Sequence, residues 1–450
     1  MNPEFQRNLW LEASPRKLAW VGLTLALIYG ATAFLARDNA NGPLGALAVC
    51  GGLVFLACGL IWGTRAVAAS VLGEIADRTW DSQRLSALTP WQMTWGKLAG
   101  SATMAWIGGL TGLVPVALSL SRDGQYGGFW TVGFLVALAI FLHAVCMAIA
   151  LIGVRKARAE GRVARANAVL GGLILGLILI LVVAGSSGFQ RGAGLSGLSS
   201  FLWARGDIAW ANGVFRAEVF RLLAMAAFAA WAVVAAWRLM RLELQMKNGP
   251  IAWPGFLIFF AAFSGGFVAP TAGVAAALLV AALAVALCAY IAAFADPADR
   301  VRLRQFGQSL GRSDLSRAMV LMPSTLAPVL LATGLVIAAL LLGTPHRFGS
   351  GPDGPQAAAL MAFVLRDLGV VTLFRFGPRS QRGDFGAVVA LALLYIVGGV
   401  IGRAMGFGEG AAFFAPLSDA PWISLVSGLV QAAIAWTLAV RRIRAPEKAR

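Results

Sequence analysis

Few side chains in this sequence have the types and spacing that chemistry at a protein site requires. His143 lies alone within one apolar run, and Arg366 and Asp367 are neighbours within another. If these runs cross a membrane, each ionisable group costs about 3 kcal/mol or more and usually faces a protein interior or a wet cavity. His143, Arg366 and Asp367 are therefore candidates for a polar lining of a transport path. The alternative is local Arg–Asp pairing and hydrogen bonding by His143 between helices.

The sequence lacks the phosphate-loop motif of nucleotide sites and the paired-cysteine motif of redox and metal sites. It contains no G-x-x-x-x-G-K-[ST] and no Cys-x-x-Cys. Gly96-Lys97 is followed by Leu98, so this pair is not part of a phosphate loop. We therefore predict no catalytic residue, no metal ligand and no cofactor bound by this chain. The cysteines lie in apolar runs and are expected to be small buried hydrophobes: Cys50, Cys58, Cys146 and Cys288.

A polar insert at residues 74–97 separates two apolar runs in the first half of the chain. Charged residues crowd its first part: Glu74, Asp77, Arg78, Asp81 and Arg84. Leu85 and Leu88 follow three apart, and Pro90 then breaks the run because its ring cannot continue a helix. A short amphipathic helix at the water side of a bilayer could contact a soluble partner. The other interpretation is an ordinary solvated loop.

Composition and charge indicate a membrane protein. The chain is 59% hydrophobic and 13% charged, with a mean hydropathy of +0.77, whereas a soluble protein carries about 25% charged residues. The net charge of +17 would suggest nucleic acid in a soluble protein. Here the Lys and Arg residues lie in short loops, so the positive-inside bias explains them and we expect no nucleic-acid partner.

Apolar runs of membrane-spanning length recur along the whole sequence. They predict about twelve helices, at 18–36, 44–70, 98–120, 129–154, 163–187, 219–240, 251–270, 272–295, 324–343, 356–376, 384–402 and 421–440. Gly108-x-x-x-Gly112 would let two of these helices approach closely. Residues 1–17 are basic and predict a short interfacial helix or a disordered tail.

The distribution of cations predicts the topology. Five Lys and Arg residues at 155–165 place that loop in the cytoplasm: Arg155, Lys156, Arg158, Arg162 and Arg165. Two spans separate this loop from the 74–97 insert, which is then cytoplasmic, as is the N-terminus. The basic C-terminal segment is expected on the same side.

The second half of the sequence repeats the plan of the first. A polar insert near 296–320 follows its second span, and Asp299-Arg300 and Leu310 align without a gap with Asp77-Arg78 and Leu88. Identity is low, so an ancient duplication and a merely shared layout both remain open. The predicted fold is an all-α polytopic membrane protein with two pseudo-repeated six-helix halves, 1–245 and 246–450.

The first insert resembles the signature of the membrane subunits of type-2 ABC exporters, a segment like E…GT…L…TP…GK between the second and third helices. The residues in matching order and spacing are Glu74, Thr79, Leu85, Leu88, Thr89, Pro90, Gly96 and Lys97. Arg78 stands where the family usually has Gly before the Thr, which puts the local turn in question. The match covers residues 74–97 tightly and the helix layout loosely.

The resemblance implies that this insert is a coupling helix that docks on a separate nucleotide-binding subunit. That subunit, in two copies, would carry ATP and magnesium, and this chain would be the permease of a bacterial cytoplasmic membrane. The coupling residues would be Glu74, Asp77, Arg78, Thr79, Asp81, Leu85, Leu88, Thr89, Pro90, Gly96 and Lys97, with Asp299, Arg300 and Leu310 in a degenerate second segment. It looks like two such subunits fused.

Three other functions are weighed against the exporter. An ion-coupled secondary transporter would need carboxylates in its spans, and the spans hold few. A membrane enzyme would need a gathered constellation of polar residues, and none is evident. A membrane anchor for a soluble complex is the third. The mostly apolar spans mildly favour an amphipathic or lipid-like substrate.

Overall fold

The structure is a computed structural model, and it describes most of the chain. The described residues are 2–38, 42–86, 88–121, 127–159, 201, 206–343, 353–377, 383–404 and 410–445. Within these ranges, nine helices are long and apolar enough to cross a membrane, and ten if one bent pair is a single span. The chain is thus an all-α polytopic membrane protein, as predicted, but a count of twelve spans is not shown. The predicted span 163–187 and residues 160–165 of the basic loop lie outside the described residues.

The chain forms two compact units. The first contains the described residues of 1–158 and 216–248, and the second contains those of 168–215 and 249–450. The origin of the predicted halves, 1–245 and 246–450, in a duplication stays a prediction.

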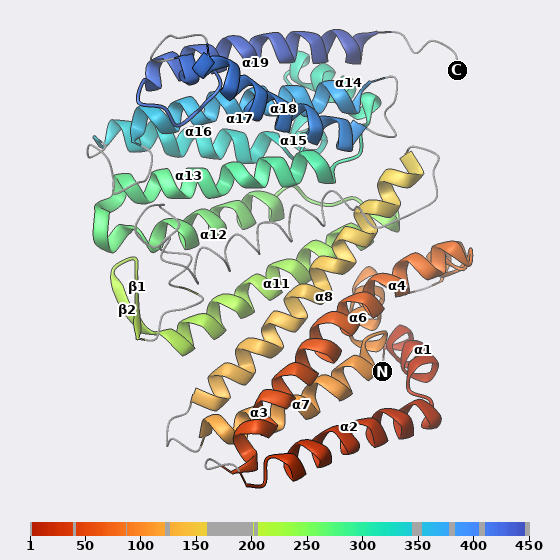
Figure 1. The fold of residues 1–450 in the computed structure, drawn as a ribbon. Coiled ribbons are helices and arrows are strands. Elements are labelled where there is room, and N and C mark those ends of the chain that lie inside the picture. Colours follow the sequence, from red (N-terminus) through yellow and green to blue (C-terminus); the bar gives the residue numbers. More distant parts are fainter. Residues whose placement is uncertain are drawn as a thin grey trace. The chain divides into compact units, whose positions relative to one another are not determined.

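The described elements of the first unit's core are helices (Figure 1). They are α1 (Pro3–Glu12), α2 (Pro15–Leu35), α3 (Pro43–Val54), the π-helical η1 (Phe55–Trp62), α4 (Gly63–Ala76), α5 (Trp80–Arg84), α6 (Pro90–Gly100), α7 (Thr103–Ser121), α8 (Gly127–Ala159) and α11 (Ala217–Glu243). Four of them, α1, α2, α3 and α6, have proline in the first turn, where a missing N–H costs nothing. The segment α3–η1–α4 is one candidate span, Pro43–Ala76.

Glycines allow α3 and α7 to approach closely in the first unit. A Cβ atom built on Gly51 of α3 would lie 2.2 Å from the carbonyl oxygen of Gly112 in α7, and one on Gly112 would lie 2.4 Å from Gly51 O. A Cβ on Gly108, one turn earlier, would lie 3.1 Å from Cys58. The close approach predicted for the Gly108–Gly112 motif is therefore confirmed.

The described part of the second unit includes a two-stranded sheet, β1 (Asp207–Trp210) and β2 (Gly213–Arg216). Its helices are α12 (Ala252–Gly266), α13 (Ala269–Ala295), α14 (Arg300–Gly311), α15 (Leu315–Leu321), α16 (Leu326–Leu341), α17 (Gly354–Arg375), α18 (Gly383–Ala404) and α19 (Pro421–Arg444), with a 3₁₀ turn η4 (Gly410–Phe413). The axes of α15 and α16 meet at 104°. A core of small and branched side chains lies between α13, α16 and α17.

Candidate functional site

The 74–97 insert contains one short helix, α5, between the end of α4 and the start of α6. Helix α4 continues through Glu74 to Ala76, the five-residue α5 follows, and α6 begins at Pro90. Pro90 does break the helical run, and it then occupies the first turn of α6. Thr89 accepts a hydrogen bond from the backbone N–H of Gln92 at 3.2 Å, and the Gln92 side chain accepts one from the N–H of Thr89 at 2.9 Å. The Thr-Pro pair of the insert is thus a helix start with a capping box.

Arg78, the one departure from the family pattern, has a left-handed backbone with φ of 57°. It follows the C-cap Asp77 of α4. The N–H of Thr79 donates to Glu74 O at 2.9 Å and that of Arg78 to Ile75 O at 3.2 Å. This is the Schellman arrangement, in which glycine is favoured at the Arg78 position because a Cβ atom strains a left-handed residue. The turn after α4 therefore forms with Arg78 at a position that favours glycine.

The two ends of the insert meet in a buried ionic cluster. Lys97 in α6 is fully buried, and its Nζ donates to Glu4 Oε1 at 2.9 Å and to Glu74 Oε2. Arg7 donates to the other oxygen of Glu74 and lies 3.6 Å from Glu4 Oε1. Two cations therefore face two carboxylates, which removes the large cost of leaving a buried charge unpaired. We call Glu4, Arg7, Glu74 and Lys97 the ionic cluster.

Helix α1 reaches this cluster because α6 presents glycines to it. A Cβ atom on Gly96 would lie 2.7 Å from Glu4 Cβ and 2.8 Å from Phe5 N, and one on Gly100 would lie 2.8 Å from Asn8 Cβ. Asn8 also donates to Glu4 Oε1 at 3.0 Å. The Gly-Lys pair of the insert therefore has two roles: Gly96 leaves room for α1, and Lys97 binds α1 through Glu4.

Around the cluster, the insert presents a mixed polar and apolar surface. Its exposed residues include Asp77, Arg78, Thr79, Asp81, Leu85, Thr89, Trp91 and Trp95. Leu85 is 89% exposed, and the rings of Trp91 and Trp95 stack with centroids 6.3 Å apart. Leu88 instead packs against the core around Val67, Met93 and Met147. Of the two predicted leucine contacts, Leu85 is exposed and Leu88 is partly buried.

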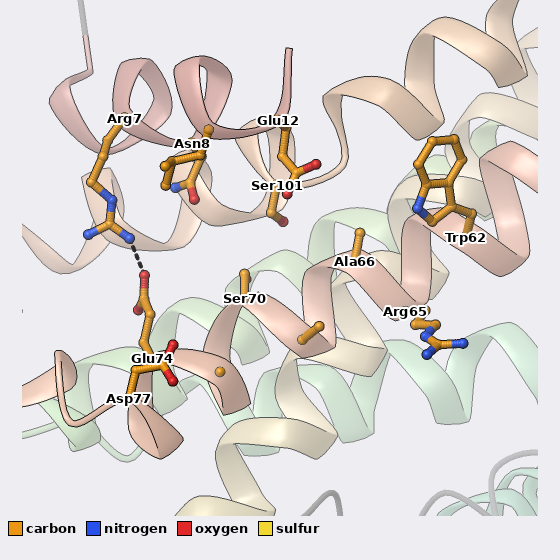
Figure 2. A pocket seen from close by; sticks show the side chains of 13 residues that line it. Arg7, Asn8, Glu12, Trp62, Arg65, Ala66, Ser70, Glu74, Asp77 and Ser101 are labelled. Carbon is orange, nitrogen blue, oxygen red and sulfur yellow. Dashed lines mark hydrogen bonds and ion pairs between the residues drawn. The ribbon is translucent and has the colours of Figure 1, made fainter. Parts of the chain in front are cut away.

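A groove of about 530 Å³ opens between α1 and α4 beside the ionic cluster (Figure 2). Small residues of α4 line it, among them Ala66, Ala69 and Gly73. Arg7 and Glu74 lie bonded at one end, and Trp62 and Arg65 lie at the other (Figure 2).

The second insert folds into more regular helices than the first. Asp299 caps α14, and its Oδ1 accepts from the N–H groups of Val301 at 2.9 Å and Arg302 at 3.0 Å. Arg300 donates to Phe376 O at 3.3 Å, while Leu310 is exposed. The second insert fits the family pattern less well than the first, yet its helix α14 is longer than α5 of the first insert.

His143 is fully buried in α8 and contacts the π-helix η1. Its Nε2 lies 2.8 Å from Gly59 O, and its ring meets that of Trp106 edge-on with centroids 5.2 Å apart. The N–H of Gly63 donates to Cys58, five residues back, as π-helical bonding requires. A Cβ on Gly63 would lie 2.2 Å from the His143 ring. This is the helix-to-helix hydrogen bond of the alternative interpretation, and a role in a transport path stays a prediction.

Arg366 and Asp367 form a buried network in the second unit. Arg366 Nε and Nη2 lie 2.8 Å and 2.7 Å from Asp367 Oδ1. The hydroxyls of Tyr290 and Tyr395 donate to Asp367 Oδ2 at 2.7 Å and 2.8 Å, and Arg366 Nη1 donates to Gln431 at 3.0 Å. The local Arg–Asp pairing is therefore present, and side chains of α13, α18 and α19 form hydrogen bonds with it.

Comparison of the chain with protein-family models, curated proteins and solved structures finds no match. The resemblance to type-2 exporters thus stays a prediction from residues 74–97.

Sequence reasoning missed the partners of both charged sites. Glu4, Arg7 and Asn8 were part of a segment read as an interfacial helix or a tail, yet Glu4 and Asn8 are buried. Their spacing of four places both on one helix face, which was the available signal. Tyr290 and Tyr395 gave no comparable signal, because a tyrosine within an apolar span is unremarkable.

Proposed function

We propose that this chain, whose described helices suit a membrane transporter-like protein, is the membrane-spanning permease of an ATP-driven exporter in a bacterial cytoplasmic membrane. It would move an amphipathic or lipid-like substrate. Two copies of a separate ATPase subunit, carrying ATP and magnesium, would drive it.

The observation that supports this proposal most is the ion pair between the ends of the insert. Glu74 ends one long apolar segment and Lys97 precedes the next, and the pair also binds α1 through Glu4. A force applied to α5 would therefore reach α4, α6 and α1 together. An unpaired loop would absorb the same force by local bending.

The exposed residues between these ends suit a protein partner. Leu85, Trp91 and Trp95 supply apolar and aromatic contact area, the kind of side chain that carries much of the energy of interfaces. Asp77 and Arg78 border them with charges of both signs. ATP binding would switch the helices only if the docked ATPase favours one of their arrangements over the other.

The proposal is tested by purifying the tagged chain from its native membrane in mild detergent and measuring ATP hydrolysis. We expect ATPase activity in a complex that contains a separate subunit with a phosphate loop. Stripping that subunit should remove the activity, and adding it back should restore it. Hydrolysis by the stripped chain alone would overturn the assignment.

The buried Asp367 favours a second candidate, an ion-coupled transporter. A carboxylate within a membrane helix is a candidate proton or ion carrier. Its oxygens are, however, occupied by Arg366, Tyr290 and Tyr395, which favours a packing role. Asp367→Asn in proteoliposomes separates the two: loss of transport driven by a pH gradient, with the protein still folded, would support the second candidate.

A further inference from the structure

The hairpin formed by α14 and α15 carries an excess of positive charge, with five arginines at Arg300, Arg302, Arg304, Arg312 and Arg317. Residues 296–321 contain three aspartates, and each is held by a neighbour within this end of the second unit. Asp296 accepts from the N–H and hydroxyl of Ser324 at 3.0 Å and 2.6 Å, and Asp299 caps α14. Asp314 accepts from the N–H of Arg317 at 3.1 Å and the hydroxyl of Ser316 at 2.9 Å.

These bonds hold the carboxylates close to the backbone. The hydrogen bonds from Arg317 and Ser316 hold the pKa of Asp314 below its ordinary value. Two of the five arginines are also engaged: Arg300 donates to Phe376 O, and Arg302 donates to Leu321 O at 3.3 Å and Met322 O at 3.0 Å. Arg302 thereby fixes the end of α15 against α14.

The other three arginines are available to a ligand. Arg304, Arg312 and Arg317 are exposed, and within the described residues their side chains form no ion pair. Beside them, α15 exposes apolar side chains: Leu315 is 67%, Met319 55% and Val320 52% exposed, while Ala318 is buried. A basic helix with an uncovered apolar face is the pattern of segments that lie on membranes.

The bend between α15 and α16 gives this face its orientation. Helix α16 is apolar and continues from α15 after a break of four residues, at 104°. If α16 enters the bilayer along its normal, α15 lies nearly parallel to the membrane surface. Its apolar face then lies at the depth of the headgroup–acyl boundary, where such faces are stable.

We propose that the α14–α15 hairpin binds the surface of the bilayer, with Leu315, Met319 and Val320 in the headgroup–acyl boundary and Arg304, Arg312 and Arg317 on anionic headgroups. Charge complementarity selects an anionic leaflet, because its negative surface potential attracts clustered cations. The second insert would thus be a membrane anchor, independent of whether the first insert docks an ATPase.

The test places a fluorescent label on α15 and asks which quencher reaches it. In a background without the native cysteines, Met319→Cys carries the label, and Ser82→Cys on the exposed α5 is the control. The full chain is reconstituted in vesicles of phosphatidylcholine alone or mixed equally with phosphatidylglycerol. Quenchers are lipid-borne nitroxides and aqueous iodide.

We expect lipid nitroxide to remove more emission at position 319 than at 82, and iodide to show the reverse order. The difference should grow with phosphatidylglycerol. Combining Arg304→Gln, Arg312→Gln and Arg317→Gln should abolish that dependence on anionic lipid, while Arg302 remains to hold the hairpin. Equal iodide quenching at both positions in both membranes would overturn the proposal. So would protection of position 319 that arises only when a soluble subunit is added, because the face would then be a protein interface.

Discussion

Lys97 and Glu74, which lie 23 residues apart in sequence, are joined by a buried ion pair that closes the base of the 74–97 insert. Glu4 of α1 binds the same ammonium group. The three helices that meet there, α1, α4 and α6, therefore share one electrostatic contact. Breaking this contact should show whether the insert moves with these three helices as a rigid unit or bends as an ordinary loop.

Replacing Lys97 with Met should destabilise the first unit strongly. The change leaves the carboxylates of Glu4 and Glu74 buried with only Arg7 to compensate them, and breaking a buried pair typically costs about 3–5 kcal/mol. Thermal unfolding in detergent should show a clearly lower midpoint. Adding Glu4→Gln and Glu74→Gln to Lys97→Met should recover part of the loss. An unchanged midpoint for Lys97→Met would show that the cluster contributes little.

Adding a methyl group at Gly96 should displace α1. In Gly96→Ala the new Cβ would meet Glu4 and the backbone nitrogen of Phe5 at less than the distance real Cβ atoms tolerate. Overpacking of this kind costs about 1–3 kcal/mol. Gly73→Ala in α4 is the control, since no atom lies within 4 Å of its Cβ. Hydrogen exchange across Pro3–Glu12 should accelerate in Gly96→Ala only. Equal exchange in both variants would contradict the close packing of α1 against Gly96.

Glycine at position 78 should stabilise the turn after α4. A left-handed conformation costs a non-glycine residue about 1–2 kcal/mol, and the greater freedom of glycine in the unfolded chain offsets part of the gain. We expect Arg78→Gly to be more stable by about 1 kcal/mol. Arg78→Ala removes the charge but keeps the strain, so it should not show this gain. If both variants gain equally, the effect comes from charge.

The two inserts should respond unequally to a negative charge. Leu85→Asp alters an exposed side chain, so it should leave folding intact while lowering partner retention and ATPase stimulation. Losing one interface anchor typically costs about 1–4 kcal/mol of binding. Leu310→Asp should do less, because its segment fits the family pattern poorly. Leu88→Asp is unsuitable as a coupling probe, since Leu88 packs against the core and the charge would disturb folding.

A larger effect at Leu310 than at Leu85 would show that the stronger dock lies in the second insert. Equal and negligible effects at both positions would remove the coupling interpretation altogether.

Hydropathy was sufficient to predict the all-α membrane fold, because each span must satisfy its own backbone within an apolar run. It could not predict the 104° bend before α16, which lies within an otherwise acceptable apolar pattern. The capping role of Thr89-Pro90 was also hidden, because Pro90 signals both the end of one helix and the start of another.

The ionic cluster was predictable only in part. Glu74 and Lys97 were singled out by the family pattern, whereas Glu4 and Arg7 belong to a short basic segment whose burial depends on the glycines of α6. Long-range pairing of this kind leaves no local periodicity in the sequence. Arg366–Asp367 was recognisable because neighbouring ionisable residues in an apolar run are expensive, but Tyr290 and Tyr395 reach it from distant helices.

The most direct test of the exporter proposal is ATP hydrolysis by the tagged chain purified with its native subunits, compared between wild type and Leu85→Asp at equal amounts of inserted chain. The account predicts that the wild-type complex hydrolyses ATP on a separate phosphate-loop subunit and that Leu85→Asp loses the subunit and the activity together. Undiminished activity and subunit retention in Leu85→Asp, or a wild-type preparation with no ATPase subunit, would contradict it.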